Sequence, residues 1–353
     1  MSPEPTTTEA ALPFDVAVLE NYLSRHIDGF EGPLTLKRFK GGQSNPTYLL
    51  TTPSRQYVMR CKPGPVAQLL PSAHAVEREY RVQSALAGSQ VPVSRMYCLC
   101  EDESVIGRAF YVMEFVDGRI FWDQSLPGMT KDERAAIYAE LNRVIAELHK
   151  VDVEAVGLAD YGKPGNYFER QIARWSKQYR ASEIDPIDAM DHLIEWLPQH
   201  IPYEAEPQVS LVHGDYRIDN VIFHPTEPRI LAVIDWELST LGHPLADFAY
   251  HLMSWHTTPA MARGLKDLDI ALLGIPGEDE YIAAYAERVG HAVWAPWNYY
   301  LAYNLFRIAA IVQGIAKRAA DGTASNAQAE IIGRNTRPLA EMGWSIAQKV
   351  AVT

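Results

Sequence analysis

Cysteine, positive charge and long apolar runs are all scarce in this 353-residue sequence. Its three cysteines, Cys61, Cys98 and Cys100, are too few for a disulfide framework, and the last two fit a half-buried strand better than a metal site. Lys and Arg number 32 against 44 Asp and Glu, and the net charge of -12 argues against a nucleic-acid partner. No run is long and apolar enough to span a membrane. The opening residues, MSPEPTTTEAALPFD, lack the basic and apolar segments of a signal peptide, so we expect a cytoplasmic protein.

The sequence changes character near residue 118, without internal repeats or low-complexity tracts. Before that point, aromatic and β-branched runs broken by Gly, Pro and Ser predict strands, with one helix over 73–86. The predicted strands cover 35–40, 47–52, 56–62, 96–100 and 110–116. A chain of this length favours two lobes. We therefore expect a β-rich lobe over 1–117, with a flexible tail at 1–13, and a mostly helical lobe over 118–353.

The second lobe opens with a strong helix signal. Thr130 and Glu133 form a capping box, and Ile137, Leu141 and Leu148 recur on one face. Further helices are predicted over 167–182, 187–199, 244–255, 278–289, 297–318 and 326–351. The short apolar runs VSLVH, NVIF and ILAVID predict strands between them. The expected fold class is therefore α+β.

The segment LVHGDYRIDNVIF, residues 211–223, places charged and amide side chains between two apolar runs. Asp215 and Asn220 lie within it, and Asp235 ends the strand run that follows. Phosphoryl transfer needs a base for the attacking hydroxyl and metal ions to neutralise the phosphates, at a fixed distance. Asp215 could be the base, with Asn220 and Asp235 as Mg²⁺ ligands, because the NVIF strand returns Asn220 beside the strand end that carries Asp235. Arg217 could reach the transferring phosphate.

The segment H-G-D-Y-R-I-D-N resembles the catalytic loop of aminoglycoside phosphotransferase and choline kinase-type enzymes, and I-D-W-E resembles their metal-binding segment. This resemblance implies a two-lobed, protein-kinase-like fold that uses ATP and Mg²⁺. It extends into the first lobe, at Y-V-M-R and V-E-R-E-Y. There it implies that Arg60 takes the place of the phosphate-binding lysine and that Glu79 is its partner on the following helix.

Two more segments of the first lobe carry the same resemblance. The loop GGQSN, residues 41–45, lies where the phosphate-covering loop does, which implies nucleotide contacts by Gly42, Ser44 and Asn45. The segment MEFVDG, residues 113–118, resembles the hinge, where the backbone of Glu114 and Val116 would hydrogen-bond adenine.

The sequence also departs from the protein-kinase pattern. Arg60 replaces a lysine, and an arginine fork differs in reach, so Lys62 on the same strand face stays an alternative phosphate contact. The spacing from Asp235 to Asp247 is too short for a long activation segment and peptide-docking platform. We therefore expect a small-molecule acceptor and no protein substrate.

Segments such as GGQSNPTYLL, YVMRCKP and DWELSTLGHPLADFAY resemble the kinase-like domain that precedes some large acyl-CoA dehydrogenases, and its free-standing bacterial relatives. That resemblance implies phosphorylation of a hydroxyl on a small acid or on a hydroxyacyl-CoA. An excess of basic residues over 290–353 is compatible with an anionic acceptor. Arg307, in the apolar context LFRIAAI, is a candidate acceptor contact. Glu237 is another, although it could equally face solvent.

Two alternatives stay open. The acceptor could be a cationic amino-alcohol or an aminoglycoside, which the overall acidity mildly favours. The chain could also be a non-catalytic nucleotide-binding module on the same fold, although it retains the base and both metal ligands. His213 and Asp247 are interpreted as structural supports of the loop. The sequence leaves the choice of ATP or GTP and the oligomeric state open.

Overall fold

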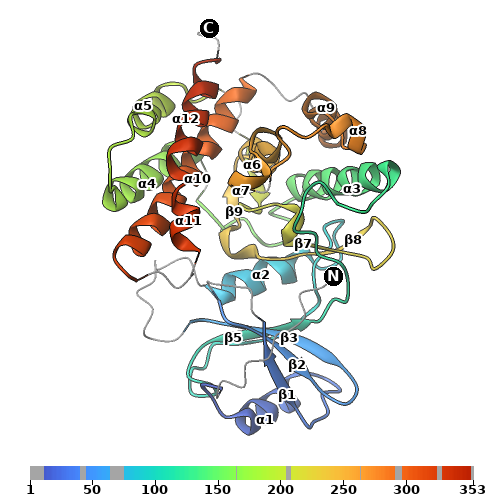
Figure 1. Ribbon diagram of the computed structural model, residues 1–353. Coiled ribbons are helices and arrows are strands. Elements are labelled where there is room, and N and C mark those ends of the chain that lie inside the picture. Colours follow the sequence, from blue (N-terminus) through green and yellow to red (C-terminus); the bar gives the residue numbers. More distant parts are fainter. Residues whose placement is uncertain are drawn as a thin grey trace.

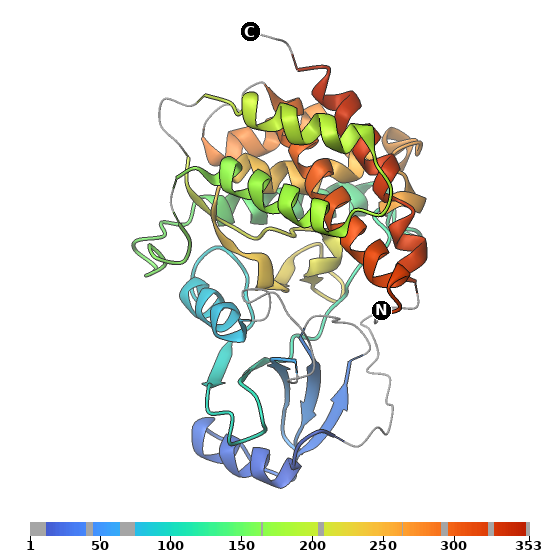
Figure 2. The same cartoon turned by 90° about the vertical axis from the view of Figure 1, so that its left-hand side faces the viewer.

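The computed structural model describes residues 12–39, 45–63, 75–163, 165–203, 208–262, 264–290, 296–323 and 328–350. Figure 1 shows a β-sheet at one end of the molecule and a larger set of helices at the other, with α2 (Val76–Leu86) between them. The turned view in Figure 2 shows the same two lobes. The expected two-lobed α+β architecture is therefore confirmed.

The N-terminal lobe is built on one five-stranded antiparallel sheet with the strand order β1-β2-β3-β5-β4. Its strands are β1 (Thr35–Arg38), β2 (Thr47–Thr51), β3 (Gln56–Cys61), β4 (Met96–Cys100) and β5 (Phe110–Glu114). Side chains alternate between the two faces, so Tyr57 and Met59 of β3 join one buried cluster while Val58 joins another. Arg60 has the parity of Val58 and lies opposite Tyr111 of β5. The register thus places Arg60 and Tyr111 on the same face.

A helix that the sequence did not lead us to expect covers one face of this sheet. It is α1 (Val16–His26). Asp15 caps its N-terminus, because the Asp15 side chain accepts a hydrogen bond from the Ala17 amide at 2.8 Å. Leu19 and Leu23 of α1 are fully buried in the cluster that contains Tyr57 and Met59. Burying apolar side chains of a short helix against a sheet supplies stability that its propensity alone does not.

The C-terminal lobe is mostly helical. Its helices are α3 (Lys131–His149), α4 (Tyr167–Ser182), α5 (Asp188–Trp196), α6 (Pro244–His256), α7 (Pro259–Ala262), α8 (Ile270–Leu273), α9 (Glu278–Val289), α10 (Trp297–Ala320), α11 (Ala329–Gly333) and α12 (Thr336–Ala347). The capping box at the start of α3 is present, with both Thr130 and Glu133 bonded to each other's backbone amides. Helix α10 is central, because it packs against α4, α6, α11 and α12.

Two short antiparallel strand pairs lie where the helical lobe meets α2 (Figure 1). Strand β6 (Ser210–Val212) pairs with β9 (Thr240–Gly242), and β7 (Val221–Phe223) pairs with β8 (Ile230–Val233). The segments between these strands carry the polar residues of LVHGDYRIDNVIF, residues 211–223. Strand β9 was not predicted, and its three residues are too few to show a periodic pattern.

The helix predicted over 326–351 is interrupted. Helices α11 and α12 are separated at Arg334 and Asn335. Pro338 lies in the first turn of α12, a position that proline tolerates, and its missing amide would break a longer helix. Asn335 also donates a side-chain hydrogen bond to the Met261 carbonyl at 3.1 Å. Within the described ranges, no helix combines the length and apolar character that crossing a bilayer requires.

Candidate active site

The loop that follows β6 is held by Asp247 of the buried helix α6. Its carboxylate accepts hydrogen bonds from the backbone amides of His213 and Gly214, each at 2.8 Å. Gly214 has φ 82°, and a Cβ there would lie 2.7 Å from the Leu238 carbonyl oxygen, so glycine is required. Burial would raise the pKa of Asp247, but the hydrogen bond from His149 and the amides outweigh it and lower that pKa. The ionised carboxylate therefore fixes the loop backbone.

Asp215 follows directly and is held in one orientation. The Tyr250 hydroxyl donates to its Oδ1 atom. The Asn220 side-chain amide donates to its Oδ2 atom at 3.0 Å and to its backbone carbonyl at 2.8 Å. The side chain of Asp215 is 22% exposed. Each carboxylate oxygen thus keeps acceptor capacity for a further group.

Asn220 and Asp235 are brought together by the β7–β8 pair. The Ile234 amide donates to the Asn220 carbonyl at 2.9 Å, so Asp235 lies one residue past the pairing. Asp235 has φ 67° and ψ 56°, a left-handed conformation that Asp and Asn adopt more readily than other side chains. Its side chain is 35% exposed. The two candidate metal ligands therefore lie at adjacent strand ends, as the sequence predicted.

Arg60 reaches across from the sheet to this strand end. Its guanidinium donates two hydrogen bonds to Asp235 Oδ1, at 3.0 and 3.1 Å, and one to Glu237 at 3.4 Å. Arg60 Nε lies 3.3 Å from Glu79 Oε2, an ion pair without the alignment of a hydrogen bond. Burial would lower the pKa of Arg60, but Glu79 and the other acidic neighbours raise it. We call Arg60, Glu79, Asp235 and Glu237 the Arg60 cluster.

Glu79 is the buried member of this cluster, with 1% of its surface exposed. It accepts hydrogen bonds from Asn45 Nδ2 at 2.8 Å and from the Tyr111 hydroxyl at 3.1 Å. Burial raises the pKa of Glu79, and Arg60 opposes that shift only in part. Glu79 thus depends on Arg60 as its cationic neighbour.

Comparison with known proteins decides the family. A family profile described as the APH phosphotransferase enzyme family matches residues 35–300. The chain belongs to this phosphotransferase family. A crystal structure from Ralstonia eutropha JMP134, provisionally named an aminoglycoside phosphotransferase, shares 61% identity and a TM-score of 0.89, covering 96% of this chain and 99% of that one.

Two further comparisons relate this chain to a longer protein and to another solved enzyme. Mouse acyl-CoA dehydrogenase family member 10 is 46% identical over 348 residues, which are 98% of this chain but only 32% of that protein. The phosphotransferase thus spans about a third of this relative. A spectinomycin phosphotransferase solved with ADP and spectinomycin shares the fold, with a TM-score of 0.63, 13% identity and coverage of 95% and 99%. The predicted family and enzyme class are confirmed: the chain belongs to the phosphotransferase enzyme family.

The remaining predictions for the nucleotide site concern residues outside the described ranges and two backbone amides. Gly42 and Ser44 lie outside the described residues. The Glu114 amide donates to the Arg95 carbonyl at 2.8 Å, whereas no described residue accepts a hydrogen bond from the Val116 amide. Nucleotide contacts by these residues stay predictions.

Lys62, the alternative to Arg60, points elsewhere. It pairs with Glu77 at 3.0 Å, and both side chains are about one-third exposed, at 34% and 35%. Among the described residues, Arg60 and not Lys62 is the cation that lies against Asp235. The geometry favours Arg60 for the phosphate contact, and the assignment itself stays a prediction.

Arg217 lies beside Asp215. Its Nε lies 3.6 Å from Asp215 Oδ1, and its NH2 group donates to Asp219 at 3.0 Å. The side chain is 40% exposed, so it can change partners at little cost. A phosphate contact by Arg217 stays a prediction.

Arg307 lies beneath the same loop. Only 7% of its surface is exposed, and it donates to the Gly214 carbonyl at 2.7 Å. Its guanidinium carbon lies 5.1 Å from the centre of the Tyr250 ring. Arg307 therefore supports the loop that carries Asp215, and its contact with an acceptor stays a prediction.

The oxygen donors of Asn220 and Asp235 fit a Mg²⁺ ion that arrives with a nucleotide. Mg²⁺ is usually bound by one or two protein oxygens, with phosphates and waters completing the octahedron. Because the Asn220 nitrogen donates to Asp215, its carbonyl oxygen is the atom left for a metal. The described residues contain no group of three His, Cys, Asp or Glu side chains that could hold a metal unaided. The donor set therefore suits a metal–nucleotide complex.

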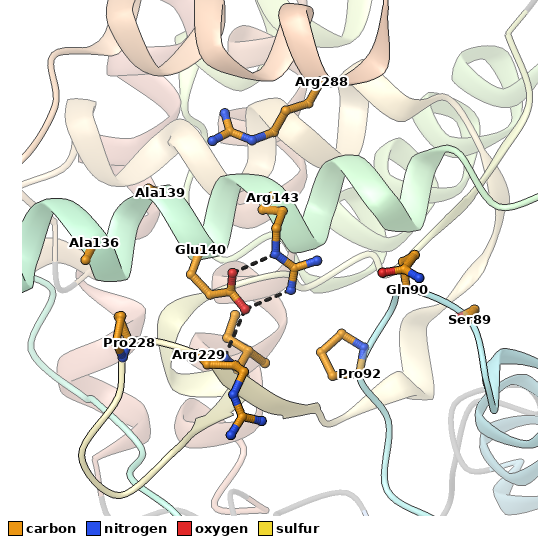
Figure 3. A pocket seen from close by; sticks show the side chains of 11 residues that line it. Ser89, Gln90, Pro92, Ala136, Ala139, Glu140, Arg143, Pro228, Arg229 and Arg288 are labelled. Carbon is orange, nitrogen blue, oxygen red and sulfur yellow. Dashed lines mark hydrogen bonds and ion pairs between the residues drawn. The ribbon is translucent and has the colours of Figure 1, made fainter.

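A surface pocket of about 660 Å³ lies apart from this loop (Figure 3). It is lined by residues of α3, α9, the turn between β7 and β8 and the segment after α2. Arg143 is committed to Glu140 through two hydrogen bonds, at 2.7 and 2.8 Å, and Arg288 to Asn142 at 3.0 Å. Because these charges are already engaged, we do not place the acceptor in this pocket.

The sequence reasoning missed Tyr250 and Tyr111. Tyr250 follows Asp247 by three residues on α6, so both side chains lie on one helical face toward the loop. Tyr111 lies opposite Arg60 in the sheet and donates to Glu79. Helical spacing from Asp247 was the available signal for Tyr250, whereas Tyr111 could be found only from the strand register.

Proposed function

We propose that this phosphotransferase transfers the γ-phosphoryl group of ATP, with Mg²⁺, to a hydroxyl of a small anionic molecule such as a hydroxy acid or a hydroxyacyl-CoA. The observation that carries the proposal is the convergence of Asp215, Asn220 and Asp235 with Arg60 where the two lobes meet. We also propose a cytoplasmic location, because ATP, the proposed donor, is available there.

Asp215 is the proposed base. Tyr250 and Asn220 each occupy one acceptor site on its carboxylate and fix its direction. The acceptor hydroxyl donates to a remaining acceptor site and gives up its proton to Asp215. The acceptor oxygen then bonds to the γ-phosphorus as the bond to the ADP oxygen breaks.

The other residues bind and orient the nucleotide in this proposal. Asn220 and Asp235 would hold Mg²⁺, which supplies positive charge against the phosphate oxygens. Arg60 would contact the α- and β-phosphates while staying beside Glu79. Arg217, next to Asp215, would contact the transferring phosphate.

The anionic acceptor is supported by the relatives and by local charge. The similarity to acyl-CoA dehydrogenase family members covers 98% of this chain in the mouse protein. Arg307 contributes a buried positive charge close to the catalytic loop. A cationic amino-alcohol or aminoglycoside would meet this charge unfavourably.

An acceptor screen tests the proposal. ADP release is measured with hydroxy acids, hydroxyacyl-CoAs, choline analogues and aminoglycosides, in the presence of ATP and Mg²⁺. Phosphorylation of an anionic hydroxyl compound is the expected result. Turnover of only cationic acceptors would replace the anionic assignment, and the absence of both acceptor-dependent turnover and slow ATP hydrolysis would favour a non-catalytic module.

Asp215→Ala separates catalysis from nucleotide binding. We expect kcat to fall by about 10²- to 10⁴-fold, because a positioned general base contributes an effect of that size. ATP should still raise the melting temperature, since Asn220, Asp235 and Arg60 remain. Asp132→Asn, in the exposed first turn of α3, is the matched loss of a carboxylate and should leave kcat unchanged. Undiminished phosphotransfer by Asp215→Ala would disprove the assigned role.

A further inference from the structure

A second arginine lies close to Arg307, on the helix that packs beside it. Arg174 is an exposed residue of α4, and α4 packs against α10, which carries Arg307. Figure 2 shows α4 running next to α10 in the helical lobe. We call Arg174 and Arg307 the arginine pair.

Aromatic rings connect the arginine pair to the catalytic base. The guanidinium carbons of Arg174 and Arg307 lie 5.0 and 5.7 Å from the centre of the Trp175 ring. Arg307 also faces the ring of Tyr250, whose hydroxyl donates to Asp215. An ordered series of contacts therefore leads from Asp215 through Tyr250, Arg307 and Trp175 to Arg174.

Neither member of the pair forms an ion pair within the part of the chain that the structure describes. No carboxylate of those residues lies within 4 Å of either guanidinium, and the hydrogen-bond acceptor of Arg307 is the neutral carbonyl of Gly214. Partial desolvation and the neighbouring charge of Arg307 lower the pKa of Arg174, whereas, despite burial, nearby tyrosines and the Asp215 carboxylate raise that of Arg307. Both guanidiniums lie beside the Trp175 ring, and an anion that contacts them would offset the repulsion between their charges.

We infer that the arginine pair binds the anionic group of the acceptor, a carboxylate or a phosphate, while Asp215 receives the proton of its hydroxyl. This inference rests on the proposed function, and it adds Arg174 as a residue that determines specificity. A guanidinium presents a planar set of donors that matches both carboxylate and phosphate geometry. Arg174 is the exposed member, so it meets the ligand directly, and Arg307 supplies charge from beneath.

Arg174→Gln tests the inference, because an exposed side chain can be changed without loss of folding. The substrates are a short hydroxy acid, its neutral methyl ester and its CoA thioester, in which the charge lies on phosphates. For the anionic acceptor that is used, we expect KM to rise about 10- to 100-fold, the range for losing a hydrogen bond between charged groups. The KM for ATP and the kcat should stay within about twofold, and added salt should weaken anionic acceptors in the wild type more than in the variant.

Matched variants give the controls. Arg174→Lys keeps the charge but loses the fork, so it should restore part of the affinity. Arg25→Gln removes one arginine from α1, at the opposite end of the molecule in Figure 1, and should change no acceptor KM. Equal rises of KM for the acid and the methyl ester in Arg174→Gln would overturn the inference. So would a rise in Arg25→Gln as large as that in Arg174→Gln.

The inference and the proposed function can fail separately. If the wild type phosphorylates only neutral or cationic alcohols, the kinase activity stands and the anion site is wrong. A titration with glutarate, followed by the melting temperature, needs no turnover: it should stabilise the wild type but not Arg174→Gln. Equal stabilisation of both proteins, or of neither, would overturn the inference even if no acceptor is turned over.

Discussion

Two arginine sites flank Asp215, and they differ in how their charge is compensated. In the Arg60 cluster, one guanidinium is surrounded by the carboxylates of Glu79, Asp235 and Glu237. In the arginine pair, two guanidiniums share one aromatic neighbour, Trp175, and no described carboxylate lies within ion-pair distance. The Arg60 cluster, which we propose faces the nucleotide, is thus locally negative, whereas the arginine pair, which we propose faces the acceptor, is locally positive.

This contrast indicates what each side binds. An excess of carboxylates favours the arrival of a cation, which is what a metal–nucleotide complex brings to Asp235. An excess of guanidiniums favours an anion. A net charge of -12 conceals this division, because it averages over the whole surface.

Arg60→Ala should have the largest effect, since it leaves Glu79 buried without its cation. We expect the free energy of unfolding to fall by about 3–5 kcal/mol, the usual cost of removing one partner of a buried ion pair. ATP affinity should fall as well. Urea unfolding and the KM for ATP measure the two effects.

Lys62→Gln is the control for that change. Its pair with Glu77 lies on the surface, so the expected loss of stability is below about 1 kcal/mol. If Lys62→Gln raised the KM for ATP more than Arg60→Ala does, Lys62 would be the phosphate contact. The Arg60 cluster would then be structural only.

A pH series tests the buried packing of α6, the helix that carries Asp247 and Tyr250. Burial lowers the pKa of His251 on α6 to about 4 from 6.5, and this residue hydrogen-bonds Tyr281 at 2.9 Å. Below pH 6.5, His251 of the unfolded chain binds a proton, whereas His251 of the folded chain stays neutral until about pH 4. Stability contributed by neutral His251 is therefore complete above pH 6.5 and falls by up to about 3 kcal/mol toward pH 4.

Urea unfolding at pH 7 and at pH 4.5 measures this loss. His251→Gln should remove that part of the pH dependence, whereas His26→Gln, on an exposed face of α1, should retain it. An unchanged pH profile in His251→Gln would show that His251 is protonated equally in both states.

Arg307→Ala tests whether the arginine pair acts as a binding site or only as a support. It removes the donor to the Gly214 carbonyl, so we expect a loss of about 1–3 kcal/mol in stability. The KM for the acceptor should rise far more than the KM for ATP. Steady-state kinetics with each substrate varied measures both, and equal rises would assign Arg307 to loop support alone.

Glu237→Gln should have the smallest effect. Glu237 is the third carboxylate around Arg60, at 3.4 Å, and its side chain is 18% exposed. With Asp235 and Glu79 still present, we expect a change below about 1 kcal/mol in stability and a small change in the KM for ATP. A large rise in the KM for the acceptor would instead place Glu237 on the acceptor side and weaken the contrast between the two sites.

Most of the fold was predictable because its signals are local. The strands near 47–52 and 56–62 and the capped helix after Thr130 follow from residue patterns, and the structure has them. Helix α1 and the interruption between α11 and α12 were missed. The former depends on packing of Leu19 and Leu23 against the sheet, and the latter on a contact between Asn335 and Met261. Both had a local signal, the four-residue spacing of Leu19 and Leu23 and the proline at position 338, but the contacts that stabilise these elements are long-range and cannot be inferred from the sequence.

The site was predictable only where motif and position coincide. The juxtaposition of Asn220 and Asp235 follows from two neighbouring strand runs, and the structure has it. Arg174 gave no signal, because an arginine on an amphipathic helix is indistinguishable from any solvated charge. Its significance arises only when α4 and α10 are brought together.

The left-handed backbone of Asp235 determines which substitutions this position tolerates during evolution. At φ 67° an asparagine fits nearly as well as an aspartate, so replacing one by the other would remove a formal charge while preserving the turn. A single base change in the codon is enough for that replacement. If Asp235 holds the proposed metal ion, this replacement would weaken catalysis while keeping the turn, which is one route to an inactive relative.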